Sequence, residues 1–454
     1  MEQDMTKGNP LSVIFMFTLP LAVGNIFQQL YNMADTIIVG RFVGADALAA
    51  VGSTGTIMFL LNGFAQGITA GFSVLTAQRF GAGKKDGVKF SVTNGVLLSV
   101  IGALLFTAFS SGIMNPLLHL MNTPDDIFDM AYTYIILISL GMIANVFYNL
   151  FSSYLRAVGN SKAPLFFLVF SACLNVGLDL FFIVVLKMGV AGAAWATNLS
   201  QAISAVLCIV YIYWKVPALV PEKKHWRLTA GDTRYQLQMG IPMALQFAIT
   251  SSGTMIMQSA INLFGSEAVA AYTAACKVHS LLTQGMVAMG QTMAVYSGQN
   301  YGRGDYKRIR AGVKAALIIE LIYSVVSAVA VSLLLGVTLG LFFSGDVDLN
   351  AMMPWARTYI TICTLFYIPL STIFIFRNTM QGCGYGFLPM MGGVVELVAR
   401  MGVAMIAMRV HSYALSCFCD PAAWISAGLF TGVSYIFVMK KIKATLAPDT
   451  SKTL

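Results

Sequence analysis

Charged side chains are scarce in this sequence. Asp, Glu, Lys and Arg make up only 10% of the 454 residues, while 57% are hydrophobic. Ordinary soluble domains carry about 25% charged residues. This balance argues against a water-soluble enzyme, a nucleic-acid-binding protein and a disordered scaffold. The net charge of +9 is therefore expected to reflect Lys and Arg in the loops of a membrane protein.

Motifs for metal binding, disulfide formation and ATP hydrolysis are also missing. The seven cysteines are an odd number, and Cys417 and Cys419 lack the spacing of a zinc-binding CxxC pair. No phosphate-binding GxxxxGK[ST] motif occurs. No ligand spacing links the four histidines, which are His119, His225, His279 and His411. These absences predict no enzymatic activity, no cofactor and no metal site of these kinds.

Long hydrophobic runs dominate the chain. A membrane-spanning helix needs about 20 mainly apolar residues, and twelve segments meet this requirement. We therefore predict an all-α polytopic membrane protein with twelve transmembrane helices. The expected spans are 11–39, 47–77, 90–118, 127–155, 164–186, 190–214, 237–264, 268–296, 312–343, 354–380, 387–408 and 422–439.

The loops between these spans alternate in charge. Lys and Arg are concentrated after spans two, four, six, eight and twelve, whereas acidic residues such as Asp125 and Asp346 occupy loops on the other side. Arg41 is the one clear exception. Because basic loops stay cytoplasmic, we expect both termini in the cytoplasm and a location in the cell (inner) membrane.

The second half of the chain repeats the first. Gly, Pro and Trp residues near span ends recur in register, as expected of a duplicated six-helix unit. The matching pairs are Pro20 with Pro242, Gly44 with Gly265, Gly83 with Gly304, Gly159 with Gly384, Pro164 with Pro389, and Trp195 with Trp424.

This repeat predicts two pseudo-symmetric lobes. We expect an N-terminal lobe at 1–214, a cytoplasmic linker at 215–236, a C-terminal lobe at 237–440 and a cytoplasmic tail at 441–454. Parallel repeats of this kind are related by an axis along the membrane normal, with a substrate site near the bilayer middle. The arrangement is typical of a transporter.

Two acidic residues lie within spans of the first half. A charge there costs about 2.5–3.5 kcal/mol on insertion scales and marks a functional site. Asp35 is in the first span and Asp179 in the fifth; Asn175 precedes Asp179 by one helical turn, and Thr197 is in the sixth span. At about 1.5 Å per residue, the groups reach a similar depth.

These groups could form an ion site. Two carboxylates, an amide and a hydroxyl are hard oxygen ligands suited to Na⁺, and repulsion between two close carboxylates favours proton binding. The alternative is a structural role, in which Asp35 and Asp179 only hydrogen-bond between helices.

The second half lacks the two acids. In the repeat register, Met257 and Ala404 replace Asp35 and Asp179, and Arg400 replaces Asn175. We therefore expect a permanent cation in the second pocket, and coupling through the first lobe alone.

Three further charges belong to the second half. Glu396 lies one turn before Arg400 and can pair with it along the helix. For Glu320 and Lys277, interhelical salt bridges are expected.

Pro20 precedes Asp35 within the same span. Proline removes a backbone hydrogen bond and kinks a helix. The kink could let the helix tilt when the ion site changes charge, or it could be a static bend.

Two stretches resemble MATE (multidrug and toxic compound extrusion) transporters of bacteria. The sequence PLAVGNIFQQLYNMAD at 20–35, followed by Gly40, Gly44 and ALAAVG at 47–52, resembles the start of these proteins. The segments at 240–242, 264–265 and 270–272 resemble their seventh and eighth helices. The resemblance covers essentially the whole chain.

The resemblance implies a secondary antiporter that exports organic cations and drugs in exchange for Na⁺ or H⁺. Family roles in cation binding fall on Asp35, Asn175, Asp179 and Thr197, and the kink falls on Pro20. NorM-type members also use acids on helices seven and ten, and this sequence has none there. The chain is therefore closer to the DinF-type branch.

The expected partners are small amphipathic organic cations and the lipid bilayer, with no nucleic acid, for a monomeric protein. The alternative function is that of a flippase for a lipid-linked precursor, as in related members of the superfamily. A flippase needs basic residues to hold pyrophosphate, for which Arg400 and Lys277 are candidates.

Overall fold

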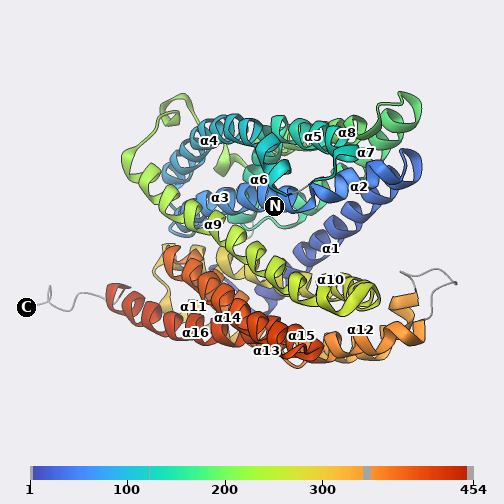
Figure 1. Ribbon diagram of the computed structural model, residues 1–454. Helices are drawn as coiled ribbons and strands as arrows, with labels where there is room; N and C mark the ends of the chain where they lie inside the picture. Colours follow the sequence, from blue (N-terminus) through green and yellow to red (C-terminus); the bar gives the residue numbers. More distant parts are fainter. Residues whose placement is uncertain (1–3, 122, 341–348, 447–454) are drawn as a thin grey trace, which may run out of the picture. The chain divides into compact units, whose positions relative to one another are not determined.

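The computed structural model describes residues 4–121, 123–340 and 349–446 (Figure 1). These residues form helices joined by short turns, and no strand occurs among them. The α-helices are α1 (Pro10–Phe42), α2 (Ala45–Ser53), α3 (Gly55–Gly81), α4 (Lys85–Leu120), α5 (Asp125–Leu140), α6 (Met142–Ala157), α7 (Lys162–Asp179), α8 (Gly189–Lys215), α9 (Ala230–Ile261), α10 (Gly265–Arg303), α11 (Tyr306–Gly340), α12 (Leu349–Thr364), α13 (Tyr367–Gly382), α14 (Phe387–Val410), α15 (Tyr413–Cys417) and α16 (Cys419–Leu446).

The helices account for the expected membrane spans. Among the described residues, 8 helices are long and apolar enough to cross a membrane. The number is up to 10 if each of two bent helix pairs is counted as one span. The two remaining expected spans are α9, with 32 residues, and α10, with 39. The end of the ninth expected span at 341–343, the loop acids Asp346 and Asp348, and tail residues 447–454 lie outside the described residues.

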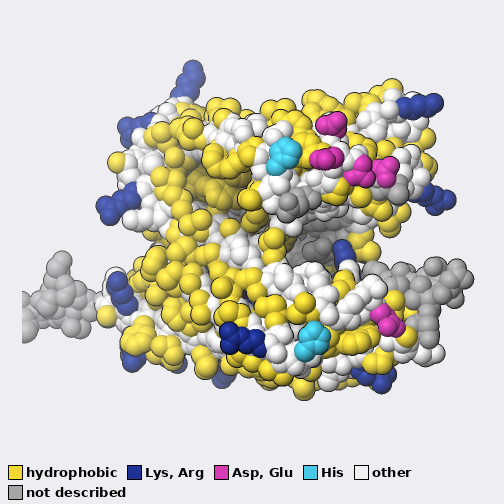
Figure 2. Space-filling model, viewed as in Figure 1, with side chains coloured by type: hydrophobic (Ala, Val, Ile, Leu, Met, Phe, Trp, Pro, Cys, Tyr) yellow, Lys and Arg dark blue, Asp and Glu magenta, His cyan; other side chains and the backbone are white. Residues whose placement is uncertain are grey.

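Large apolar side chains point outward from these helices. Phe109 of α4, Leu333 of α11 and Val410 of α14 are each exposed by 66% or more. In Figure 2, hydrophobic side chains cover much of the visible face, and charged side chains are few among them. Such a surface requires a hydrocarbon environment rather than water, so the chain is a multi-pass membrane protein.

The two bent spans occupy equivalent places in the repeat. The α5–α6 pair bends by 47° and the α12–α13 pair by 48°. At the first bend, a Cβ on Gly141 would overlap the side chain of Asn198, whose Nδ2 donates to the carbonyl of Leu137 at 2.7 Å. The carbonyl of Leu137 also accepts from the backbone amide of Gly141 at 3.1 Å, so the side chain of Asn198 is a second donor that ties α8 to the bend.

Backbone conformation repeats as well. Four pairs of residues with positive φ lie at equivalent helix ends, whereas Gly8 and Gly189, which also have positive φ, have no such counterpart. The predicted pseudo-symmetry of the two halves is thus confirmed in the backbone. The pairs are Gly44 (φ 127) with Gly265 (φ 87), Gly83 (φ 69) with Gly304 (φ 82), Gly159 (φ 84) with Gly384 (φ 91), and Lys187 (φ 54) with His411 (φ 56).

The chain divides into two compact units, which we call the N-unit and the C-unit. The N-unit contains Val23–Phe247, and the C-unit contains Met5–Ala22 together with the chain from Ala248 onward. Helices α1 and α9 are therefore each divided, shortly after Pro20 and Pro242. The lobes expected from sequence, at 1–214 and 237–440, differ from these units. They would put the segment of α1 before Val23 in the first lobe and residues 237–247 of α9 in the second.

Hydrogen bonds attach the first part of α1 to the C-unit and the first part of α9 to the N-unit. In the C-unit, Thr18 of α1 donates to Thr292 of α10 at 2.8 Å, and the backbone amide of Met5 donates to Gln299 at 2.9 Å. In the N-unit, Asn94 of α4 donates to Gln236 of α9 at 2.8 Å.

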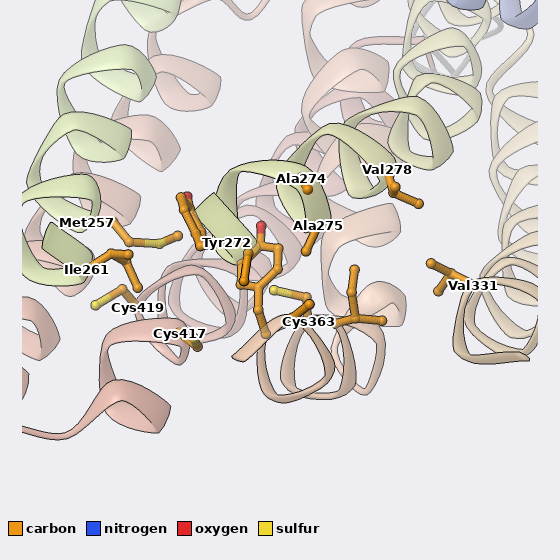
Figure 3. Close-up of a cluster of buried hydrophobic side chains, with 14 of the residues drawn as sticks. Met257, Ile261, Tyr272, Ala274, Ala275, Val278, Val331, Cys363, Cys417 and Cys419 are labelled. Carbon is orange, nitrogen blue, oxygen red and sulfur yellow. The ribbon is translucent and has the colours of Figure 1, made fainter. Parts of the chain in front are cut away.

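Each unit has its own hydrophobic core. In the C-unit, Met257 and Ile261 of α9, Tyr272 and Ala275 of α10 and Cys363 of α12 are buried in one cluster (Figure 3). Cysteine sulfurs contribute to this packing as small hydrophobic groups, and all seven cysteines of the chain are free thiols.

Candidate functional site

The predicted ion-site residues come together within the N-unit. Asn175 and Asp179 are one turn apart on α7, and both are fully buried. The Nδ2 atom of Asn175 donates to Oγ1 of Thr197 on α8 at 3.4 Å. Asp35 of α1 is near enough for its carboxylate to act electrostatically on Asp179. Three helices thus contribute to one constellation.

The site has more buried acceptor oxygens than donors. Oδ1 of Asp35, Oδ1 of Asn175 and both carboxylate oxygens of Asp179 are buried without a hydrogen-bond partner. Leaving a buried polar atom unpaired costs about 1–3 kcal/mol, and more for charged groups. Four such oxygens in one place are the expected ligand set of a small cation or of protons.

The backbone changes its helical form at Asp179. The α-helix α7 ends at this residue, and a π-helix follows at Leu180–Val185. A π-turn widens the helix, changes the direction of the following side chains and is frequent at functional sites. No residue pattern in the sequence indicates this irregularity.

Two tyrosines belong to the site but are absent from the sequence-based set. Tyr31, one turn before Asp35 on α1, lies beside Thr197 and within the electrostatic influence of both acids. Tyr134 of α5 is buried and is influenced by Asp35 and Asp179. The spacing of Tyr31 and Asp35 on one helix face could have identified the first of them, whereas Tyr134 depends on tertiary packing.

The C-unit contains a buried charge cluster. Nε of Arg400 donates to Oδ1 of Asp420 at 3.0 Å, and Nη2 lies 2.8 Å from the same oxygen. The partner of Arg400 is thus Asp420 of α16, not Glu396 as expected. Arg377 of α13 and Glu396 are also buried, and the positive charges of Arg377 and Arg400 act on Glu396.

The salt bridges expected for two other charges are not formed within the described residues. Glu320 of α11 is only 2% exposed, and no ion pair or hydrogen bond reaches its carboxylate from those residues. Lys277 of α10 is exposed and likewise makes no salt bridge with them. The described part of the chain also has no group of three or more His, Cys, Asp or Glu residues placed to hold a metal ion.

Comparison with known proteins identifies the family. The MatE family model matches residues 20–181 and 242–406, one segment in each half of the chain. The chain belongs to the MATE family. The resemblance of its two sequence stretches to MATE transporters is thereby confirmed, and members of this family are transporters, not enzymes.

Individual relatives agree with the MATE assignment. The chain is 31% identical over 308 residues to the probable multidrug resistance protein YpnP of Bacillus subtilis, covering 67% of this chain and 68% of the relative. It is 26% identical to the probable multidrug resistance protein YoeA of the same organism, covering 98% and 97%.

Solved structures share the MATE fold. A crystal structure of MATE in the bent conformation matches with a TM-score of 0.88 and 22% identity, covering 98% of each chain. The predicted fold class is therefore confirmed: an all-α membrane protein with the two-lobe architecture of MATE transporters.

Proposed function

We propose that the protein is a secondary antiporter that exports small organic molecules, cations in particular, in exchange for Na⁺ or H⁺. Relatives named as multidrug resistance proteins support organic substrates. The coupling site is the constellation of Asp35, Asn175, Asp179 and Thr197, to which Tyr31 is added.

The observation that carries this proposal is the buried carboxylate of Asp179. Neither of its oxygens accepts a hydrogen bond from a described donor, and the carboxylate of Asp35 is close enough to repel it when both are ionised or to share a proton with it. Two adjacent carboxylates in a largely desolvated place can both be ionised only when a cation compensates their charge; otherwise one of them holds a proton. Ion binding therefore changes the net charge of a site formed by α1, α7 and α8.

Coupling follows from where these helices lie in the chain. Asp35 is on the part of α1 that packs in the N-unit, whereas the residues before Val23 pack in the C-unit. A change of ion occupancy at Asp35 thus acts on a helix shared by both units, with Pro20 next to the division. An ion can bias the exchange between two conformations only through different affinities for them.

The topology belongs to the same proposal. The protein lies in the cell (inner) membrane as a monomer with both termini in the cytoplasm, as the charge alternation of the loops favours. The absence of acidic residues from 237–265 and 354–386 supports coupling in the N-unit alone and membership of the DinF-type branch of the family.

Efflux from proteoliposomes tests the proposal. A cationic dye is loaded, and a Na⁺ or a pH gradient is imposed separately on wild type, Asp35→Asn and Asp179→Asn. We expect one gradient to drive efflux in wild type and both substitutions to abolish it. Transport that survives both substitutions would contradict coupling at these acids.

The same assay separates the flippase alternative. A flippase for a lipid-linked precursor needs basic side chains free to hold pyrophosphate, and Arg400 is buried and paired with Asp420. Failure of both gradients to drive dye efflux, together with movement of a pyrophosphate-linked lipid across the bilayer, would favour the flippase.

A further inference from the structure

The repeat identifies the C-unit counterpart of the ion site. In the register that matches Pro20 with Pro242, Tyr31 corresponds to Gly253. Asn175 of α7 corresponds to Arg400 of α14 in the register of the later helices. The N-unit therefore has a tyrosine and an amide where the C-unit has a glycine and a guanidinium.

These two exchanges compensate each other in space. A Cβ added at Gly253 would lie 2.3 Å from Nη1 of Arg400, which is closer than van der Waals contact permits. In the N-unit, the bulky Tyr31 is thus combined with the small Asn175. In the C-unit, Gly253, which has no side chain, is combined with the large Arg400. Glycine at 253 is what allows the guanidinium to occupy this place.

Arg400 fills the pocket as a fixed cation. Its side chain is 3% exposed and bonds to Asp420 through Nε and Nη2. Nη1, which faces Gly253, is buried without a hydrogen-bond partner. A guanidinium stays charged at every physiological pH, so the positive charge beside Asp420 is permanent.

We propose that Arg400 is a covalently attached substitute for a coupling ion, and that it restricts ion binding to the N-unit by masking a latent cation site at Asp420. This inference rests on the proposed function for its reading of the N-unit site. Arg400 is thus a residue that determines how many ions the protein binds.

The charge balance of the cluster supports the assignment. Of the two buried arginines and two buried acids in the cluster, only Arg400 and Asp420 are joined by an ion pair, so Arg400 supplies the positive charge that compensates Asp420. Removing the guanidinium leaves one uncompensated buried carboxylate, which must bind a monovalent cation or a proton.

Apart from Arg377 and Arg400, no described titratable group of this cluster is positively charged in its ordinary state, and His279 alone can gain a positive charge, by binding a proton. The remaining titratable side chains on which Asp420 acts are neutral in their ordinary states near pH 7; they are Tyr272, Cys276, His279, Tyr359, Cys363, Cys417 and Cys419. Without Arg400, Asp420 should therefore bind a cation or a proton.

Counting bound ions on the purified full-length protein tests this inference. Radioactive ²²Na⁺ binding is measured at pH 8, and proton uptake is measured on transfer from pH 8 to pH 5.5. We expect Arg400→Met to bind one more Na⁺ or proton per protein than wild type. The double variant Arg400→Met with Asp420→Asn should return to the wild-type number.

Two outcomes would overturn the inference: the same ion count in Arg400→Met and wild type, or an extra ion that persists in the double variant. If Arg400→Met does not yield monodisperse protein, Arg400→Gln keeps a hydrogen-bond donor beside Asp420 without the charge, and the same extra ion is expected.

A further comparison separates this inference from the proposed function. In protein that carries Asp35→Asn and Asp179→Asn, adding Arg400→Met should still add one ion. Equal ion counts in wild type and Asp35→Asn with Asp179→Asn would contradict only the N-unit site.

Discussion

Arg79 at the end of α3 binds Asp232 in the first turn of α9 with two nitrogens. Nη1 donates to Oδ2 at 2.7 Å and Nη2 donates to Oδ1. Both side chains are largely buried, with 24% and 12% exposure. This bidentate pair fixes the first part of α9 within the N-unit, and no helix-spacing rule predicts it.

Asp232→Ala should lower the stability of the N-unit. The substitution leaves the largely buried guanidinium of Arg79 without its counter-charge, bonded only to the carbonyl of Gly87, which costs about 1–3 kcal/mol. Thermal unfolding of the purified protein in detergent measures the effect, with Arg41→Ala at an exposed arginine as control. The interchange Arg79→Asp with Asp232→Arg should recover part of the loss, and an unchanged Tm in Asp232→Ala would contradict the role of the pair.

Gly71→Ala should destabilise the packing of α3 on α9. A Cβ there would lie 2.4 Å from the Cα of Gly240, and because backbone cannot rotate away, we expect a loss of about 1–3 kcal/mol. Gly102→Ala in α4, where a Cβ meets nothing within 4 Å, should instead stabilise the helix by about 0.5–1 kcal/mol. We therefore expect Gly71→Ala to lower the Tm and Gly102→Ala to raise it. Two shifts of the same sign would contradict this prediction.

Asp179→Asn should stabilise the protein while making it insensitive to the coupling ion. The substitution removes one of two repelling carboxylates and keeps the size of the side chain. A ligand that binds only the folded state adds about 2.7 kcal/mol at 100 times its Kd, so wild type should show a rise of Tm with Na⁺ or with acidification.

The Asp179→Asn variant should start at a higher Tm and lack this rise. Asp46→Asn, at an exposed acid of α2, serves as the matched control. An ion-dependent shift of wild-type size in Asp179→Asn would show that the ion binds elsewhere.

Glu320→Gln should leave transport intact and leave the Tm equal or higher. The wild-type carboxylate is buried, and no ion pair compensates its charge within the described residues, so a neutral amide costs less to bury. Glu267→Gln at an exposed position of α10 is the control. Loss of gradient-driven efflux in stably folded Glu320→Gln would move coupling to α11.

The folded conformation of the linker should lose stability only at acid or strongly alkaline pH. Hydrogen bonds from Lys89 and then Lys224 lower the pKa of Glu222 from 4.5, so their stabilisation is complete above that value and is lost as the pH falls through the lower folded value. The pKa of Lys224 is raised from 10.5 by Asp86 and then Glu222, so its contribution is complete below 10.5 and is lost as the pH rises through the higher value.

Hydrogen-exchange protection factors of linker amides should therefore be constant between these limits and fall below pH 4.5. Glu222→Gln should remove the fall at acid pH. Protection that declines equally in both proteins would assign it to other carboxylates.

The sequence was sufficient for the helical membrane fold, the repeat and the grouping of Asp35, Asn175, Asp179 and Thr197. Span length, loop charge and helical spacing are local properties, and they predict such features directly. The π-helix after Asp179 depends on packing that no spacing rule encodes.

Partners contributed by distant segments were missed. Asp420 lies just outside the last span expected from sequence, at 422–439, although α16 begins at Cys419. Glu396 was the nearer acid in sequence and was therefore preferred as the partner of Arg400. Spacing within one helix was a poor guide there, because the pair joins two helices.

The exchange of first-helix segments has a consequence for biosynthesis. Thr18 bonds to Thr292, which lies 274 residues later in the chain. At about 5–20 residues per second, the ribosome needs roughly 14–55 seconds to supply this partner. The first segment of α1 thus leaves the ribosome long before the helices it packs against, and each half translated alone would lack a piece that the other half supplies.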